Sequence, residues 1–374
     1  MRYYLIAGEA SGDLHGSNLM KGLKQEDPGA QFRFRGGDMM AAVGGTLVYH
    51  YKEGAVMGVS DVIMKSRQLA DNLKACREDI LKWDPDVVIL IDYPGFNFRI
   101  ARFAHEKGIK VYWYIAPKTW ASRQGRNRKL KAWVDKLFIV FPFEKDYFAS
   151  KGIPYVYKGN PLVDAVDSHE YKRPCEGPYI AILAGSRKGE MDRMMPVCMQ
   201  MADRYPDRHF IIAGAPAREY LDYAAHMEGR PNVELMFDRT YDILKYADCA
   251  VINSGTASLE AALIGTPQVV CWSTSGLTYF VASKLLRVVQ RIKYISLANL
   301  ILDKFIFKEL IQGDFTVDKL CAEVGRLCGD GACRAQMTAD YAAVREALGG
   351  AGASRAVARA MVGSLRRVGA GIEN

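Results

Sequence analysis

The chain has no long hydrophobic run. No stretch approaches the roughly 18–20 consecutive apolar residues that a membrane-spanning helix needs. Its apolar runs, such as residues 87–91 and 137–141, are short and have the length of buried parallel strands. Residues 1–8 lead directly into a strand-like segment and a glycine, without the charged region, apolar region and cleavage site of a signal peptide. We therefore expect no signal peptide and a chain that stays on the cytoplasmic side.

Metal-binding and phosphate-loop motifs are also missing. The eight cysteines are scattered, with no C-x-x-C and no histidine pair at zinc spacing, so we expect small hydrophobic thiols in a reducing compartment and no metal. No G-x-x-x-x-G-K-[ST] occurs, and Gly8, Gly12 and Gly16 are four apart rather than spaced as G-x-G-x-x-G. These absences disfavour a P-loop ATPase and a nicotinamide enzyme, and we predict no cofactor.

What is present is the pattern of an α/β protein. The 374 residues are 49% hydrophobic and 25% charged, as in globular proteins, and are enough for two domains. Short apolar runs alternate with amphipathic stretches, which is typical of parallel sheets. A polar, proline-containing segment between Asp167 and Pro178 interrupts the pattern and predicts a linker. We predict two Rossmann-like domains, residues 1–165 and 166–350, facing each other across a cleft.

The strand predictions locate the candidate site. The predicted strands are residues 3–7, 32–36, 87–91, 110–115, 136–141 and 155–157, and then 179–183, 209–213, 233–236, 249–252 and 268–271. From Val317 onward only helices are predicted, with an interruption at residues 349–352. Ligands of open parallel sheets bind beyond the carboxyl ends of the strands. Polar residues directly after these strands are therefore the candidate site residues.

In the first half, two strands are followed by such residues. The turn after the first strand contains Glu9, Ser11, Gly12 and Asp13, where glycine lets backbone N–H groups approach a ligand at a helix start. A merely tight turn is the alternative. Asp92 directly follows strand 87–91, where it could take a proton from an attacking hydroxyl. A turn or N-cap aspartate would give the same sequence signal.

The second half has two similar turns. Arg187 lies between a strand and a helix, where its guanidinium and the helix N-terminus suit a pyrophosphate, although a surface arginine is the alternative. Residues 253–260 again follow a strand and open a helix, and their hydroxyls and amides suit phosphate oxygens. Glu260 could reach a ribose, or it could be a first-turn glutamate favoured by the helix dipole.

The net charge of +8 favours anionic partners. Six basic residues and no acid lie between Lys118 and Lys131, bracketed in large part by Trp120 and Trp133. This basic segment could bind nucleic acid, or it could bind a phosphorylated or membrane-bound substrate. It could also be a solvated helix face. The apolar stretch at residues 55–64 is unusual for a loop and, beside a basic run, also describes an interfacial surface.

These motifs, in this order, resemble those of the bacterial lipid-A-disaccharide synthases. The similarity extends from the first strand to about Gln312. It is carried by residues 8–13, 55–58, 91–97, 117–121, 141–144, 185–187, 254–260 and 296–300. One such motif would be weak evidence, whereas this many in a single order is specific.

The resemblance implies an inverting glycosyltransferase of the two-Rossmann, GT-B type, with an N-terminal acceptor domain and a C-terminal UDP-sugar domain. Its donor would be UDP-2,3-diacylglucosamine and its acceptor 2,3-diacylglucosamine 1-phosphate, called lipid X. The acceptor 6-hydroxyl would attack the anomeric carbon, giving a β-1,6-linked disaccharide 1-phosphate and UDP. Enzymes similar to this use no metal and are peripheral on the anionic surface of the inner membrane.

The resemblance also assigns residues. Asp92 matches the proposed general base, Arg187 the diphosphate-contacting arginine, Glu260 the UDP-side glutamate, and Asn299 a motif asparagine near the donor phosphates. The further donor candidates are Gly185, Ser186, Ser254, Gly255 and Thr256. The acceptor or cleft candidates are Glu9, Ser11, Gly12, Asp13, Asn97, Lys118, Trp120 and Arg123.

Two positions depart from the family pattern. Asn160 stands where a histidine is usual, and Ser122 replaces a second tryptophan.

GT-B enzymes often pack a last helix on the first domain, which here would span about residues 352–370, and the family can exchange C-terminal segments in a homodimer. A UDP-sugar 2-epimerase on the same fold is the alternative enzyme, disfavoured by the apolar stretch. A nucleotide-sugar-binding protein without catalysis is disfavoured by the presence of Asp92, and no motif supports nucleic-acid binding.

Overall fold

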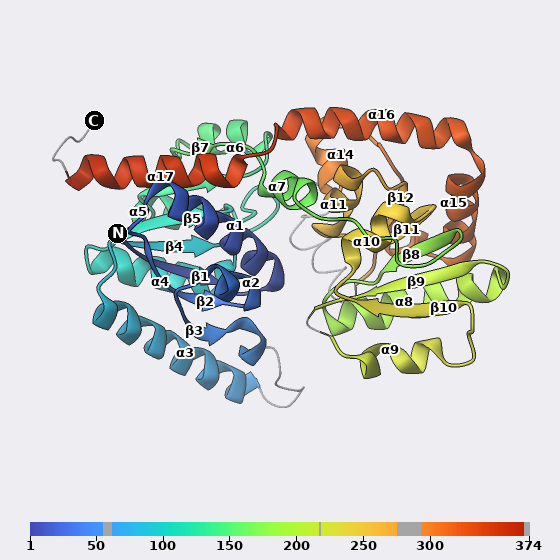
Figure 1. Ribbon diagram of the computed structural model, residues 1–374, viewed down its shortest axis with the longest axis horizontal. Helices are drawn as coiled ribbons and strands as arrows, with labels where there is room; N and C mark the ends of the chain where they lie inside the picture. Colours follow the sequence, from blue (N-terminus) through green and yellow to red (C-terminus); the bar gives the residue numbers. More distant parts are fainter. Residues whose placement is uncertain (55–61, 217, 275–292, 370–374) are drawn as a thin grey trace. The chain divides into compact units, whose positions relative to one another are not determined.

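Two compact units make up the chain. The computed structural model describes residues 1–54, 62–216, 218–274 and 293–369. The first unit combines Met1–Ala165 with Gly350–Asn374, and the second is Val166–Gly349. Each unit contains a parallel β-sheet with helices on its two faces (Figure 1).

The sheet of the first unit has seven parallel strands in the order β3-β2-β1-β4-β5-β6-β7. Their bounds are β1 Arg2–Ala7, β2 Gln31–Gly36, β3 Thr46–His50, β4 Val87–Ile91, β5 Lys110–Tyr114, β6 Lys136–Ile139 and β7 Val156–Tyr157. All five residues of β4 are apolar and fully buried, as expected for a strand covered on both faces. The strand order reverses between β1 and β4, and this switch point is where open α/β sheets bind ligands.

The helices of the first unit connect these strands. They are α1 Ala10–Glu26, α2 Asp38–Val43, α3 Val62–Trp83, α4 Pro94–Glu106, α5 Arg126–Trp133, α6 Glu144–Ser150 and α7 Pro161–Asp167, with a 3-10 turn at Tyr51–Gly54. Apolar residues of α1 recur at helical spacing and are buried, among them Leu19 and Leu23. Pro94 begins α4, where its fixed φ suits the first helical turn.

The second unit repeats the same topology. Its six parallel strands lie in the order β10-β9-β8-β11-β12-β13, so the reversal falls between β8 and β11. The strands are β8 Tyr179–Leu183, β9 His209–Gly214, β10 Val233–Phe237, β11 Cys249–Asn253, β12 Gln268–Trp272 and β13 Glu309–Ile311. The helices are α8 Lys188–Arg204, α9 Tyr220–Met227, α10 Thr240–Tyr246, α11 Ala257–Ile264, α14 Leu297–Leu302, α15 Val317–Gly329 and α16 Gly331–Leu348, with a 3-10 turn at Gln312–Asp314.

The predicted α/β class with two Rossmann-like sheets is confirmed. All eleven predicted strands are present, and two short strands at the edges of their sheets, β3 and β13, were not predicted. The strand predicted over residues 136–141 ends at Ile139. It ends early because the N–H groups of Val140 and Phe141 donate to the Glu144 carboxylate instead of continuing the ladder.

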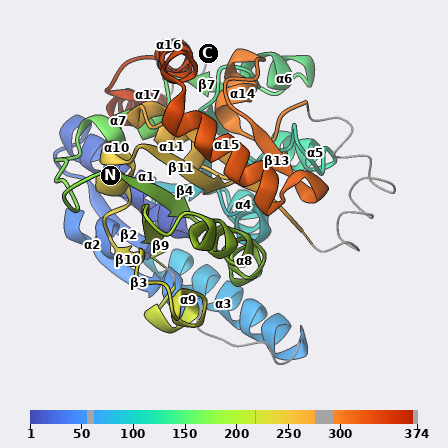
Figure 2. The ribbon, with the colours of Figure 1, turned by 90° about the vertical axis from the view of Figure 1, so that its right-hand side faces the viewer.

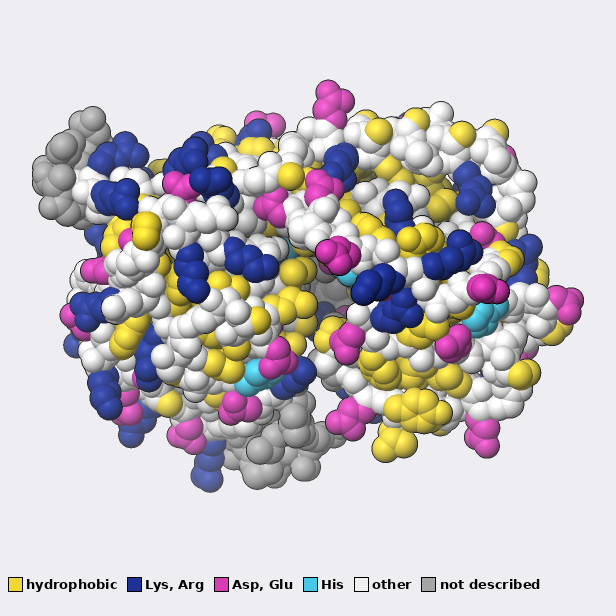
Figure 3. Space-filling view, in the orientation of Figure 1, with side chains coloured by type: hydrophobic (Ala, Val, Ile, Leu, Met, Phe, Trp, Pro, Cys, Tyr) yellow, Lys and Arg dark blue, Asp and Glu magenta, His cyan; other side chains and the backbone are white. Residues whose placement is uncertain are grey.

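The last helix, α17 (Ala353–Gly369), packs along α1 in the first unit (Figures 1 and 2). Asp164 accepts backbone N–H groups at its start, including that of Ser354 at 2.7 Å. Glu26 of α1 pairs with Arg355 and Arg359. Basic side chains gather over this helix in the space-filling view (Figure 3). None of the helices in the described residues is both long and apolar enough to cross a membrane.

We expect Gly22→Val to loosen the contact between α1 and α17. A Cβ at Gly22 would lie 3.1 Å from the Arg355 Cα and 3.2 Å from the Ser354 carbonyl oxygen, which are backbone atoms that cannot rotate away. We expect a loss of about 1–3 kcal/mol, measured as a lower midpoint of urea unfolding. Gly363→Ala is the control, because a Cβ there meets no atom within 4 Å and alanine favours a helix. Equal midpoints for the two variants would contradict this packing.

Candidate active site

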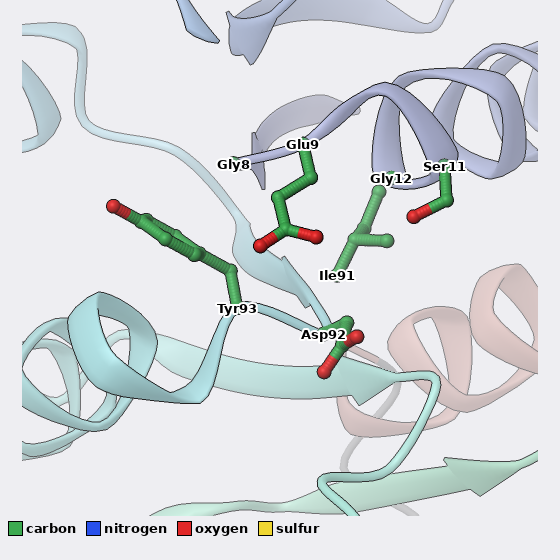
Figure 4. A pocket seen from close by; sticks show the side chains of 7 residues that line it. All are labelled: Gly8, Glu9, Ser11, Gly12, Ile91, Asp92 and Tyr93. Atoms are coloured by element: carbon green, nitrogen blue, oxygen red, sulfur yellow. The ribbon is translucent and has the colours of Figure 1, made fainter. Parts of the chain in front are cut away.

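A small pocket lies at the switch point of the first sheet, where β1 and β4 end (Figure 4). It contains about 180 Å³ of empty space, part of it open to solvent. The residues that line it are Gly8, Glu9, Ser11, Gly12, Ile91, Asp92 and Tyr93. Glu9, Ser11 and Asp92, which come from the two turns after β1 and β4, therefore line one cavity.

The backbone of Asp92 is held in an unusual conformation. Asp92 and Tyr93 have φ angles of 42° and 46°, a left-handed region that costs a non-glycine residue about 1–2 kcal/mol. Asn97 Nδ2 donates to the Asp92 carbonyl oxygen at 2.7 Å, and the Asp92 N–H donates to the Tyr114 carbonyl oxygen at 3.1 Å. These hydrogen bonds offset the strain and hold the backbone from which the Asp92 side chain extends. Such strain, maintained by surrounding contacts, is typical of functional sites.

Tyr93 is a pocket residue that sequence reasoning missed. Its ring lies against Gly8, so that a Cβ at Gly8 would be only 2.3 Å from the Tyr93 Cγ. The ring also stacks on Phe96, with centroids 5.7 Å apart. Gly8 is thus required because the ring occupies the space that any side chain would need. A tyrosine directly after the candidate base was the available signal.

Two predicted residues of this region have supporting positions. Asp13 does not line the pocket; its buried carboxylate accepts the backbone N–H groups of Gly37, Met39 and Met40 at 2.8–3.1 Å, which holds the start of α2. Asn97 is fully buried beneath Asp92 and acts on its backbone. Both residues shape the site without facing the cavity.

Trp120 is held by Glu144, a residue for which no separate role was predicted. Trp120 Nε1 donates to Glu144 Oε1 at 3.2 Å, and the Val140 and Phe141 N–H groups donate to Oε2. Burial raises the pKa of Glu144 from its ordinary value of 4.5 to about 7, against the opposing effect of these bonds and of Lys118. An acid directly after an aromatic run was the sequence signal.

The basic segment follows Trp120 and leads into α5. Lys118 and Arg123 are exposed, and Arg123 has a φ of 55°. Arg126 is half-buried, and its pKa is lowered by burial and by the charge of Arg123. Two guanidinium groups of like charge therefore lie near each other, an arrangement that an anion would stabilise.

The two departures from the family pattern have different surroundings. Asn160 is buried and donates through Nδ2 to the Val140 carbonyl oxygen at 2.9 Å, while its Oδ1 accepts the Leu162 N–H at 2.9 Å. It therefore secures the turn before α7. Ser122 is exposed.

At the switch point of the second sheet, the turns after β8 and β11 come close together. Gly185 has a φ of 98°, and a Cβ there would lie 2.5 Å from Asn253 Nδ2 and 2.7 Å from Glu190 Oε2. Only glycine fits this position. The carbonyl oxygen of the next residue, Ser186, accepts a bond from Arg218 at 3.0 Å.

Arg187 is the N-cap residue of α8. Its side chain is exposed, and Nη1 lies 3.0 Å from Glu190 Oε1. Glu190 also accepts the Arg187 N–H at 3.3 Å, so one carboxylate orients both ends of the residue. The guanidinium is thus located at a helix N-terminus, where an anionic ligand would be favoured.

The turn after β11 opens α11. Ser254 is half-buried and donates to the Ile295 carbonyl oxygen at 3.4 Å, Gly255 is exposed, and Thr256 is the N-cap residue. Glu260 accepts a bond from the Tyr241 hydroxyl at 2.9 Å, and burial raises the pKa of Glu260. Tyr241 is a further residue that sequence reasoning did not identify.

Asn299 is fully buried and its amide is used within the unit. Nδ2 donates to the Phe307 carbonyl oxygen and to Glu309, and Oδ1 accepts the Ile306 N–H at 2.9 Å. Asn299 therefore organises the segment that joins α14 to β13. Over the residues that the structure describes, no group of three or more His, Cys, Asp or Glu side chains could hold a metal ion.

Comparison with known proteins gives consistent results. The sequence model of the lipid-A-disaccharide synthetase family matches residues 3–360. Lipid-A-disaccharide synthases of Geobacter metallireducens and Geobacter sulfurreducens are 36% and 35% identical to the chain, each alignment covering 96% of it and 95% of the relative.

Among solved structures, the S. aureus MnaA–UDP co-structure has a TM-score of 0.69 at 15% identity, covering 98% of this chain and 97% of that one. The UDP-GlcNAc 2-epimerase of Methanocaldococcus jannaschii, in complex with UDP-GlcNAc and UDP, has a TM-score of 0.64 at 13% identity, covering 97% and 99%. At such low identity these structures show the fold alone.

The two sheets, each with its strand order reversed at the centre, and polar turns at both reversals define the GT-B class, which comprises glycosyltransferases and related epimerases. Within that class the epimerases are related to this chain only distantly, through the fold. The chain belongs to the lipid-A-disaccharide synthase family, and it is a glycosyltransferase.

We expect Glu144 to make stability depend on pH. Because its folded pKa of about 7 lies above the ordinary 4.5, the folded state binds the proton more tightly, and this stabilisation is lost as pH rises from 4.5 to 7. The stability of the wild type relative to Glu144→Gln should fall by up to about 3 kcal/mol over that range. Urea unfolding at several pH values measures this difference. The exposed Glu106→Gln is the control, and parallel profiles for wild type and Glu144→Gln would contradict the assignment.

Proposed function

We propose that the chain transfers 2,3-diacylglucosamine from its UDP conjugate to the 6-hydroxyl of lipid X, releasing UDP. The observation that carries this proposal is the strained, hydrogen-bonded Asp92 at the first switch point. In the reaction, the acceptor O6 forms a bond to the anomeric carbon on the face opposite UDP. The bond from that carbon to the β-phosphate oxygen breaks, and the configuration inverts from α to β.

In this mechanism Asp92 takes the proton of the attacking hydroxyl. A general base must lie within hydrogen-bond reach of that proton, and Asp92 lines a pocket at the end of a central strand. Glu9, Ser11 and Gly12 line the same pocket and would contact the acceptor sugar. Asn97 and Asp13 would act indirectly, through the backbone segments that they hold.

The donor would bind to the second unit. Arg187 would neutralise the diphosphate as UDP departs, together with the N–H groups at the starts of α8 and α11. Gly185, Ser186, Ser254, Gly255 and Thr256 form the turns before these helices. We propose that Glu260 binds on the UDP side next to Tyr241, and that Asn299 supports the site without direct phosphate contact.

Lys118, Trp120 and Arg123 would serve the acceptor side, where a phosphate monoester needs positive charge. The same basic segment, with the arginines of α17, supports peripheral binding to the anionic cytoplasmic surface of the inner membrane. The apolar stretch at residues 55–64, expected to contribute to this contact, lies outside the residues whose side chains the structure describes. A homodimer is a further proposal from the family resemblance, and light scattering would test it.

A detergent-micelle assay tests the reaction. UDP-2,3-diacylglucosamine and labelled lipid X are incubated with the protein, with a chelator and no added metal. We expect a disaccharide 1-phosphate and UDP in equal amounts. Conversion of the UDP-sugar without lipid X would instead support the epimerase alternative, and no turnover with either arrangement would contradict the proposed substrates.

We expect Asp92→Asn to lower kcat about 100-fold or more while leaving UDP affinity nearly unchanged, because the amide cannot accept the proton. Glu9→Gln is the matched control, since Glu9 is the other carboxylate of the same pocket. Single-turnover rates and UDP titrations measure the two effects. If Glu9→Gln removed turnover and Asp92→Asn spared it, the base would be Glu9.

We expect Arg187→Ala to weaken UDP binding about tenfold or more through loss of a charge-assisted contact to the diphosphate. Lys188→Ala is the matched control, because Lys188 is exposed one position later and pairs with Asp192. Calorimetric titration with UDP gives both dissociation constants. An unchanged affinity in Arg187→Ala would remove this role.

A further inference from the structure

Two of the eight free cysteines lie in contact with each other. The sulfur atoms of Cys249 and Cys328 are 3.7 Å apart. Cys249 is fully buried at the first position of β11, and Cys328 is half-buried in the last turn of α15. Both belong to the second unit, 79 residues apart in the sequence.

Packing of the core brings the pair together. Helix α15 lies against β11 and β12, and its apolar face buries Leu320, Val324 and Leu327. Cys328 follows Leu327 on this helix, next to the start of β11. The backbone that carries each thiol is therefore fixed by a regular element, and the contact does not depend on a loop.

The surroundings give the two thiols different reactivities. Contact with Cys249 and the charge of Arg208 lower the pKa of Cys328 to about 7, with a smaller effect from Arg334, while burial and Asp248 oppose the shift. The pKa of Cys249 is raised well above its ordinary value by the hydrogen bond with Cys328 and by burial. Cys328 is thus the more accessible of the two thiols and the one whose pKa is lowered, which makes it the more reactive, while Cys249 is buried beside it.

We propose that Cys249 and Cys328 form a reversible disulfide when the protein meets a peroxide. The Cys328 thiolate attacks one peroxide oxygen, the O–O bond breaks, and the departing hydroxide takes up a proton to become water. The sulfur of Cys249 then attacks the Cys328 sulfenic acid, and the second oxygen leaves with the Cys249 proton as water. The peroxide gains the two electrons that the thiols lose, and a dithiol reverses the bond.

The bond would form away from the donor turns. Cys249 begins β11, whereas Ser254 and Thr256 follow the opposite end of that strand. The sulfur atoms need to approach from 3.7 Å to about 2.05 Å. The inference therefore stands independently of the proposed transfer reaction, and its consequence is that Cys249 protects Cys328 from further oxidation.

Peptide mapping tests the proposal. The folded protein is treated with hydrogen peroxide, free thiols are alkylated, and the digest is analysed by mass spectrometry without reduction. We expect a peptide pair that joins Cys249 to Cys328, two hydrogen atoms lighter than the sum of its parts and separated by dithiothreitol. Cys333→Ser is the matched control, because Cys333 is also half-buried, and this variant should keep the cross-link.

Cys249→Ser should lose the cross-link and accumulate the Cys328 sulfinic acid, which the wild type avoids. Far-UV circular dichroism before treatment verifies that each variant is folded. Recovery of Cys328 in the oxidised wild type as the alkylated thiol would overturn the proposal. So would equal sulfinic acid formation in the wild type and Cys249→Ser.

Discussion

The hydrogen bond from Asn97 to the Asp92 carbonyl oxygen is the contact on which the first half of the site depends. A chain that leaves a parallel strand normally passes directly into a turn or helix, but here two successive residues adopt the left-handed conformation. The buried amide compensates for that strain and prevents the turn from relaxing. The carboxylate of Asp92 is therefore carried by a rigid strand end. A catalytic group that is held in place in this way does not have to be reoriented before it reacts.

The switch point of the second unit also contains a close approach, made by other residues. There the close approach is between Gly185 and the side chain of Asn253, each at the end of a strand that flanks the switch point. In the first unit the corresponding glycine is Gly8, whose missing side chain leaves room for the Tyr93 ring. A parallel sheet whose strand order reverses creates an opening, and the two glycines let neighbouring side chains pack beside it.

Much of the fold could be predicted because the central strands are continuous apolar runs, of which β4 is the clearest. The edge strands β3 and β13 were not predicted, since they are only five and three residues long and combine polar with apolar residues. For the site, position after a strand identified Asp92 and Glu9, which meet at one pocket. It could not separate them from Asp13, whose carboxylate satisfies backbone N–H groups of α2, because that role depends on a segment distant in sequence. The same limit applies to Glu144, whose partner Trp120 lies 24 positions earlier.

The attachment of α17 to the first unit has a consequence for synthesis of the chain. Residues 166–349 form a unit that is continuous in sequence and can fold as soon as they have left the ribosome. The first unit begins earlier but contains residues from 350 onward, and Asp164 can bind the start of α17 only after that helix has been made. The part translated first is therefore completed after the second unit, and α1 keeps an uncovered face until α17 has been translated.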